Sequence, residues 1–375
     1  MLFHSDLSMV CMGIIVANVI YKCPTCGGDL GWSAEKQNWT CEYCGDAFTL
    51  EQLGEVNAKA EQESKQEAYQ EVDQEEFTAA NDGTEGGDIV GYSCSHCGAE
   101  IITDRATAAT ICPYCRNPII MAAQVSGNIA PQWVIPFKID RKNVEDAFLK
   151  FAKKPLTPKE FRTKEVVSKI QGIYIPFWLY TGASDGELYA EGVNTRTWIS
   201  GDKRYTERTY YDVYRSGNLG FTRVPADASK KTEDAAMDSI EPFDMQEMRE
   251  FNIGYLAGYY AERFDLDDAA CFERAKERVE HSTLEELRST AQYDSVTVKN
   301  FQCRIDSSPA EYALFPSYLM KTKYHGKEYL FAMNGQTGKF TGNLPISKIK
   351  LTVFSFVGGI GGFLIGLAAS VFAGN

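Results

Sequence analysis

The stretch CPTCGGDLGWSAEKQNWTCEYC at residues 23–44 contains two CxxC pairs separated by fourteen residues. The same frame recurs at residues 94–115 as CSHCGAEIITDRATAATICPYC. A duplicated C-x2-C-x14-C-x2-C pattern is typical of zinc ribbons, in which one tetrahedral ion joins two tight CxxC turns, or knuckles. The sequence therefore predicts two structural Zn²⁺ ions per chain, held by Cys23, Cys26, Cys41, Cys44, Cys94, Cys97, Cys112 and Cys115.

The residues that follow the CxxC pairs fit this interpretation. Three of the four pairs are followed directly by glycine, and a small residue there lets backbone N–H groups turn toward the sulfurs. Such donors stabilise the net charge of about −2 that four thiolates leave around Zn²⁺. A closed four-thiolate site has no open coordination position, so these ions are expected to stabilise the fold rather than to catalyse a reaction.

Other uses of the cysteines remain open at this point. Disulfides would need an oxidising compartment, and a thioredoxin-like redox pair would need a βαβ context. An iron centre is a further alternative, and His96 could replace a cysteine as a ligand. Pairing within each frame is favoured, although the sequence also allows each ion to bridge the two frames.

The negative charge of the chain is concentrated in one segment. The net charge is −13, and residues 51–88 contain twelve Asp or Glu against two Lys. This segment is expected to be a solvated helical or flexible linker, with an acidic interaction segment as the alternative. The frames themselves are not basic, so the counterion release that drives nucleic-acid binding is not expected.

Both ends of the chain are apolar. Residues 351–373 contain no charge and would form a helix about 34 Å long, which predicts a C-terminal transmembrane helix. Lys348 and Lys350 precede it, so residues 1–350 are expected in the cytoplasm, with the protein single-pass in the cell membrane. Gly358, Gly362 and Gly366 form a small-residue stripe that could support a homodimer. Residues 9–20 are expected to be a strand that enters the first ribbon.

The region 131–345 predicts an α+β domain with antiparallel strands. Asp140 is a candidate N-cap, and the stripe of Cys271, Ala275 and Val279 indicates a long helix over about 267–291. Alternating and β-branched patterns predict strands at 171–180, 204–217, 311–325 and 327–342. His325-Gly326 and Asn334-Gly335 fit hairpin turns.

Recognisable catalytic patterns are missing from the sequence. The stretch GQTGKF at 335–340 has the wrong spacing for a phosphate-binding loop, and no GxGxxG follows a strand. The four histidines stand in no nucleophile or metal pattern. Asp244 with Glu247, and Glu285 with Glu286, are expected to be exposed helix charges rather than catalytic pairs. We therefore do not expect an enzyme, although an unrecognised site in the central domain is an alternative.

Several phrases occur together with the cysteine frames: IPFWLY at 175–180, VPADAS at 224–229, MDSIEP at 237–242, NIGYLAGYYAE at 252–262 and FAMNGQTGK at 331–339. In this combination the chain resembles the bacterial family of TFIIB-type zinc-ribbon-containing proteins. The resemblance covers nearly the whole chain from about residue 21. It implies zinc ligation by the eight cysteines, a large family-specific domain and a hydrophobic C-terminal sequence, and it implies no activity.

The sequence as a whole predicts a membrane-tethered cytoplasmic zinc protein that serves as an interaction or scaffold module for a protein partner. Its predicted parts are a ribbon at 21–50, a linker at 51–88, a second ribbon at 89–125, the α+β domain at 131–345 and the transmembrane helix at 351–373. A nucleic-acid-binding ribbon protein is the alternative function.

Overall fold

The computed structural model describes residues 21–53, 89–94, 97, 99–104, 106–115, 117–125, 130–352 and 355–356. The predicted N-terminal strand at 9–20 and nearly all of the acidic linker lie outside these residues. The statements below refer to the described residues.

Sheet dominates the described chain. An 11-stranded sheet forms the body, a three-stranded sheet contains the first cysteine frame, and a two-stranded sheet contains the first part of the second frame. The three-stranded sheet consists of β1 (Leu30–Ser33), β2 (Asn38–Cys41) and β3 (Ala47–Phe48), and the two-stranded sheet of β4 (Ile89–Ser93) and β5 (Glu100–Asp104). The strands of the main sheet are β6 (Thr107–Ile111), β7 (Pro118–Ile120), β8 (Trp133–Val134), β9 (Gln171–Ser200), β10 (Lys203–Asp227), β11 (Arg249–Glu250), β12 (Tyr260–Glu262), β13 (Ser295–Ser307), β14 (Glu311–Tyr324), β15 (Lys327–Asn334) and β16 (Phe340–Gly342).

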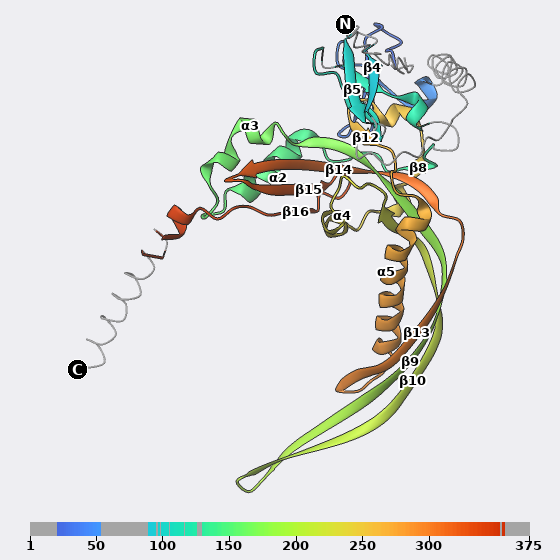
Figure 1. Ribbon diagram of the computed structural model, residues 1–375, viewed down its shortest axis with the longest axis vertical. Coiled ribbons are helices and arrows are strands. Elements are labelled where there is room, and N and C mark those ends of the chain that lie inside the picture. The colour runs from blue at the N-terminus through green and yellow to red at the C-terminus, as the bar shows by residue number, and fades with distance from the viewer. Residues whose placement is uncertain are drawn as a thin grey trace, which may run out of the picture.

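Strand β9 organises this sheet. Its first half pairs with β14 on one side and, in parallel, with the short β12 on the other. Its second half pairs with β10 and β13, both antiparallel. The result is a long, curved extension of β9, β10 and β13 that leaves the body at one end (Figure 1).

Helices flank the sheet. The long helix α5 (Asp268–Ser289) lies along the inner side of the curved extension (Figure 1). Its buried residues include Cys271, Ala275 and Val279, as the sequence predicted, and Leu287 packs with Leu188 of β9. The other helical segments are α2 (Arg141–Ala152), α3 (Lys164–Val167), α4 (Asp234–Ile240) and the 3-10 turns at Ala122–Val125, Lys159–Arg162, Met245–Glu247 and Ile253–Leu256.

Local predictions from capping and turn residues are confirmed at several positions. The Asp140 side chain accepts from the backbone N–H of Asn143 and caps α2. His325 and Gly326 both have positive φ in the turn between β14 and β15. Asn334 instead ends β15 at a longer loop, where its Oδ1 accepts from the N–H groups of Gln336 and Thr337.

The predicted α+β class is wrong, because the described chain is mostly sheet. Strands β9 and β10 span 30 and 25 residues, far beyond the predicted 171–180 and 204–217. Glycines interrupt the apolar alternation in β9, and these are the positions where other groups approach closely. A Cβ at Gly182 would lie 2.1 Å from the carbonyl oxygen of Asp306, and one at Gly192 would lie 2.6 Å from the Tyr293 ring.

The membrane predictions require a second correction. Residues 351–352 and 355–356 are helical, and the rest of the predicted span 351–373, including Gly358, Gly362 and Gly366, lies outside the described residues. In the part of the chain that the structure describes, no helix has the length and apolar character needed to cross a membrane. Four predictions rested on hydropathy, length and spacing alone and are withdrawn. They are the transmembrane helix, the membrane as a partner, the single-pass location and the glycine-stripe homodimer.

Candidate metal centres

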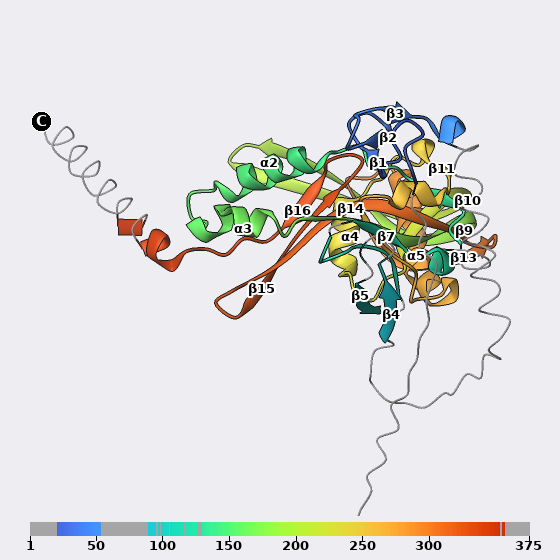
Figure 2. The same cartoon turned by 90° about the horizontal axis from the view of Figure 1, so that it is seen from above.

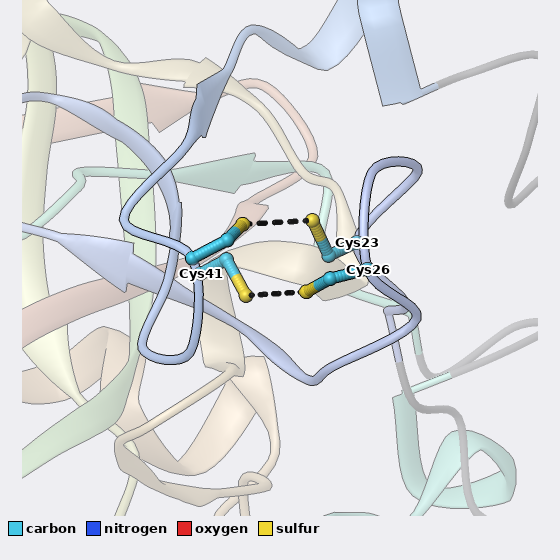
Figure 3. Close-up of side chains that lie close together, drawn as sticks. Cys23, Cys26 and Cys41 are labelled. Carbon is cyan, nitrogen blue, oxygen red and sulfur yellow. Dashed lines mark hydrogen bonds between the residues drawn. The ribbon is translucent and has the colours of Figure 1, made fainter.

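The four cysteines of the first frame form one cluster. Cys23 Sγ lies 3.6 Å from Cys44 Sγ, and Cys26 Sγ lies 3.5 Å from Cys41 Sγ. All four sulfurs lie within 4.8 Å of one another, and Figure 3 shows Cys23 and Cys26 facing Cys41 across the space between the knuckles. A tetrahedral ion with metal–sulfur bonds of about 2.3 Å separates its sulfurs by about 3.8 Å. The cluster could therefore hold a metal ion of this kind.

Both knuckles of this frame are closed by backbone hydrogen bonds. Gly27 N donates to Cys23 O at 2.9 Å, and Gly45 N donates to Cys41 O at 3.0 Å. Gly27 and Gly45 have φ values of 73° and 77°, which residues with a Cβ rarely adopt. The glycines after the CxxC pairs are thus explained by the turn that each knuckle makes.

Backbone donors tune the thiols of this cluster. Burial raises the pKa of Cys23, but the backbone N–H groups of Cys26 and Thr25 donate to its sulfur and lower the pKa to about 7. The pKa of Cys44 is raised to about 12, since burial and the neighbouring sulfurs outweigh the hydrogen bond from the Asp46 backbone. Without a cation, ionisation of Cys23 is therefore favoured and ionisation of Cys44 is resisted. A bound divalent cation would remove this resistance.

The second frame repeats the arrangement. Cys94 Sγ lies 3.7 Å from Cys115 Sγ, and Cys97 Sγ lies 3.8 Å from Cys112 Sγ. The pKa of Cys112 is again lowered to about 7, because hydrogen bonds from the Cys115 and Tyr114 backbone outweigh its burial. The sulfurs thus gather within each frame, not across the frames. His96 lies outside the described residues, and all eight cysteines are free thiols.

A side-chain bridge connects the two frames. Asn117 Nδ2 donates to Asp29 Oδ2 at 3.0 Å. The backbone of Asn117 also hydrogen-bonds the sulfur of Cys115, and its carbonyl oxygen accepts from Cys112 N at 2.8 Å. Asp29 follows the first knuckle of the other frame and is ion-paired with Lys22. The two candidate centres therefore share a contact directly beside their ligands.

Both frames are attached to the main sheet. In the first frame, Trp39 Nε1 donates to Gly254 O at 2.9 Å, and Trp32 Nε1 donates to Phe137 O at 3.2 Å. Both indoles pack against Tyr255. In the second, β6 and β7 are strands of the main sheet itself, with β6 paired to β12. These contacts make the frames parts of one packed body rather than modules on a string. The sequence showed the cysteine spacing but carried no signal for this attachment.

The carboxylate pairs considered in the sequence have structural roles where the structure describes them. Lys138 and Gln336 Nε2 bind the Glu247 carboxylate, and these contacts lower its pKa although slight burial raises it. Asp244 caps the turn at Met245–Glu247. Glu285 pairs with Arg288 on the exposed side of α5. A cavity of about 530 Å³ between Phe151, Leu156, Leu344 and Ile346 contains Lys154 as its charged group.

Comparison with known proteins gives one informative match. The uncharacterized protein YdjG of Bacillus subtilis (strain 168) is 35% identical over 351 residues, which cover 93% of this chain and 96% of the relative. No family model matches the chain, so the TFIIB-type resemblance rests on the phrases that carry it. No solved structure gives a significant match.

Proposed function

This chain belongs to the family of the uncharacterized Bacillus subtilis protein YdjG, and we propose that it is a zinc-stabilised scaffold that binds a protein partner. In this proposal each cysteine cluster holds one structural Zn²⁺ ion. Residues 21–50 and 89–125 form the two ribbons, residues 51–88 link them, and residues 131–345 form the body that presents the binding surface.

The observation that carries the proposal is the closed geometry of the two clusters. Each brings four sulfurs within 4.8 Å of one another, with sulfur pairs 3.5 to 3.8 Å apart. Four thiolates suit zinc in a structural role, since they complete the tetrahedron and leave no position for water or substrate. The tryptophans of the first ribbon and the strands of the second would transmit this stabilisation to the sheet.

The position of the exposed sheet surface supports the scaffold role. The metal clusters brace one end of the body, while β9, β10 and β13 extend from it as a long sheet whose distal part carries exposed aromatic side chains. A rigid sheet held at one end can present a partner-binding surface without any catalytic group. We infer that zinc maintains the shape of the platform and that recognition takes place on the sheet.

Metal analysis of cysteine variants tests the zinc part of the proposal. The full-length chain, purified under reducing conditions, should contain two Zn²⁺ per chain by native mass spectrometry. Cys26→Ser and Cys97→Ser should each lose one ion, because three thiolates no longer complete the tetrahedron. Cys303→Ser is the matched control, since Cys303 belongs to neither cluster and should leave two ions bound. Equal zinc content in all four proteins would contradict the proposal.

A further inference from the structure

The end of the β9–β10 hairpin projects beyond the rest of the sheet. Pairing with β13 stops at Val193, whereas β9 and β10 continue to pair with each other as far as Ser200 and Lys203. We call residues 194–209 the arm tip, and all of them are exposed. Figure 1 shows it extending past the ends of β13 and α5. An isolated two-stranded hairpin is marginally stable in water, so intrinsic stability does not explain why this one is so long.

The arm tip is basic although the protein is acidic. It contains four cations and two carboxylates, in a chain whose net charge is −13. Elsewhere in the described chain many cations are neutralised by ion pairs, such as Arg223 with Glu311. None of the arm-tip cations forms an ion pair with a described residue. These cations are Arg196, Lys203, Arg204 and Arg208.

Two aromatic rings stack across the strands on one face of the arm tip. Trp198 and Tyr205 are cross-strand partners whose ring planes are 14° from parallel, with centroids 5.7 Å apart. The Arg196 guanidinium lies 5.9 Å from the Trp198 ring. Trp198 and Tyr205 remain 42% and 45% exposed, and Ile199 on the opposite face is 70% exposed. The arm tip thus offers apolar surface on both faces.

The backbone at the edge of β10 is also available. Within the described chain β10 pairs with β9 alone, so its other edge has unpaired N–H and C=O groups. Such an edge can accept an added strand from another chain, with main-chain hydrogen bonds providing affinity. Arg204 and Arg208 lie on the same face of β10, four residues and about 13 Å apart. This spacing matches two side chains four positions apart on one face of an added strand.

We propose that the arm tip binds an extended acidic segment of a partner protein, which adds to the edge of β10 with its carboxylates opposite Arg204 and Arg208. This inference specifies the partner of the proposed scaffold and rests on that part of the proposed function, not on the zinc ions. Charge complementarity favours an acidic strand, because a strand can place its carboxylates on the face of Arg204 and Arg208, whereas Glu207 lies on the other face of β10. A phosphate backbone is charged continuously and cannot avoid Glu207 in this way.

A peptide-binding assay with the full-length chain tests the proposal. The probe is a fluorescein-labelled peptide of alternating Glu and Thr, and the comparison probe is a peptide of alternating Lys and Thr. We expect saturable binding of the Glu-Thr peptide only. The double variant Arg204→Glu/Arg208→Glu should weaken it by about tenfold or more, and Trp198→Ala should weaken it by a smaller factor. The variant Lys142→Glu/Lys327→Glu has the same change in net charge on exposed residues outside the arm tip and should retain binding within about threefold.

Several outcomes would overturn the proposal. One is an equal loss of affinity in the Lys142/Lys327 control, which would indicate non-specific charge attraction. Another is tighter binding of a poly(U) RNA or of anionic vesicles that is lost in the Arg204/Arg208 variant, which would assign the arm tip to a different partner. Zinc content is measured on the same samples. Two bound ions without peptide binding would contradict only the proposal that the arm tip binds a peptide. Peptide binding without zinc would contradict the zinc part of the proposed function.

Discussion

At the scale of single residues, the cysteine knuckles show what local sequence can predict. The CxxC spacing and the glycines at 27 and 45 specify the turn and the sulfur positions, because all of these groups lie within a few residues of one another. The role of Asn117, which joins the two frames through Asp29, could not be predicted. The two side chains are 88 positions apart, and nothing in the local pattern connects them.

Asp227 is a second residue whose role only the structure shows. Its side chain is fully buried, with Oδ1 2.5 Å from Arg274 Nη1, and Oδ2 has no hydrogen-bond partner among the described residues. Burial raises its pKa to about 6 although Arg274 lowers it. The native state therefore binds a proton that the unfolded state releases near pH 4, and stability falls as the pH rises from about 4 to about 6.

The substitution Asp227→Asn should remove this pH dependence. The asparagine stays neutral, so the stability of the variant relative to the wild type should increase by roughly 1 to 3 kcal/mol as the pH rises from about 4 to about 6. Differential scanning fluorimetry across this range measures the change as a growing difference in melting temperature. Asp234→Asn is the control, because Asp234 also contacts Arg274 but is 59% exposed. Parallel pH profiles for wild type and Asp227→Asn would contradict the assignment.

At the scale of elements, glycine in β9 made the strand difficult to predict and is necessary for its packing. Gly192 leaves room for the Tyr293 ring, and Gly186 leaves room for Thr283 and Leu287 at the end of α5. In the sequence such glycines break the alternation that indicates a strand, so a 30-residue strand could not be recognised. The helix α2 was predictable because its cap, Asp140, acts on a residue three positions away, and α5 was predictable from its apolar stripe.

A glycine pair tests this packing argument. Gly192→Ala places a methyl group 2.6 Å from the Tyr293 ring, so the ring must move, and the variant should lose about 1 to 3 kcal/mol of stability. Gly220→Ala in β10 is the matched control, since no heavy atom lies within 4 Å of the added Cβ, and it should be neutral or slightly stabilising. Thermal unfolding of both variants provides the comparison. Equal melting temperatures would mean that the α5 end of the sheet is less tightly packed than the structure indicates.

At the scale of the whole molecule, the cysteine clusters lie in and beside the body, and the arm tip is at the distal end of the curved extension. The strands of the two frames lie against the body, and the arm tip is at the far end of β9 and β10 (Figure 1). Figure 2 shows β1, β2 and β3 next to the body, seen from above. Long-range pairing creates this layout: β12 joins β6 to β9, and β14 joins β9 to β8. Such pairings leave no local trace, so the sequence predicted the cysteine clusters but not the arrangement of the main sheet.

We propose that each frame binds one zinc ion through its own four thiolates. X-ray absorption at the zinc edge of the full-length chain, purified with its metal, measures the ligand atoms directly. We expect a single shell of four sulfurs at about 2.3 Å around zinc, with no nitrogen or oxygen ligand. A shell containing nitrogen or oxygen, or fewer than four sulfurs per zinc, would contradict it.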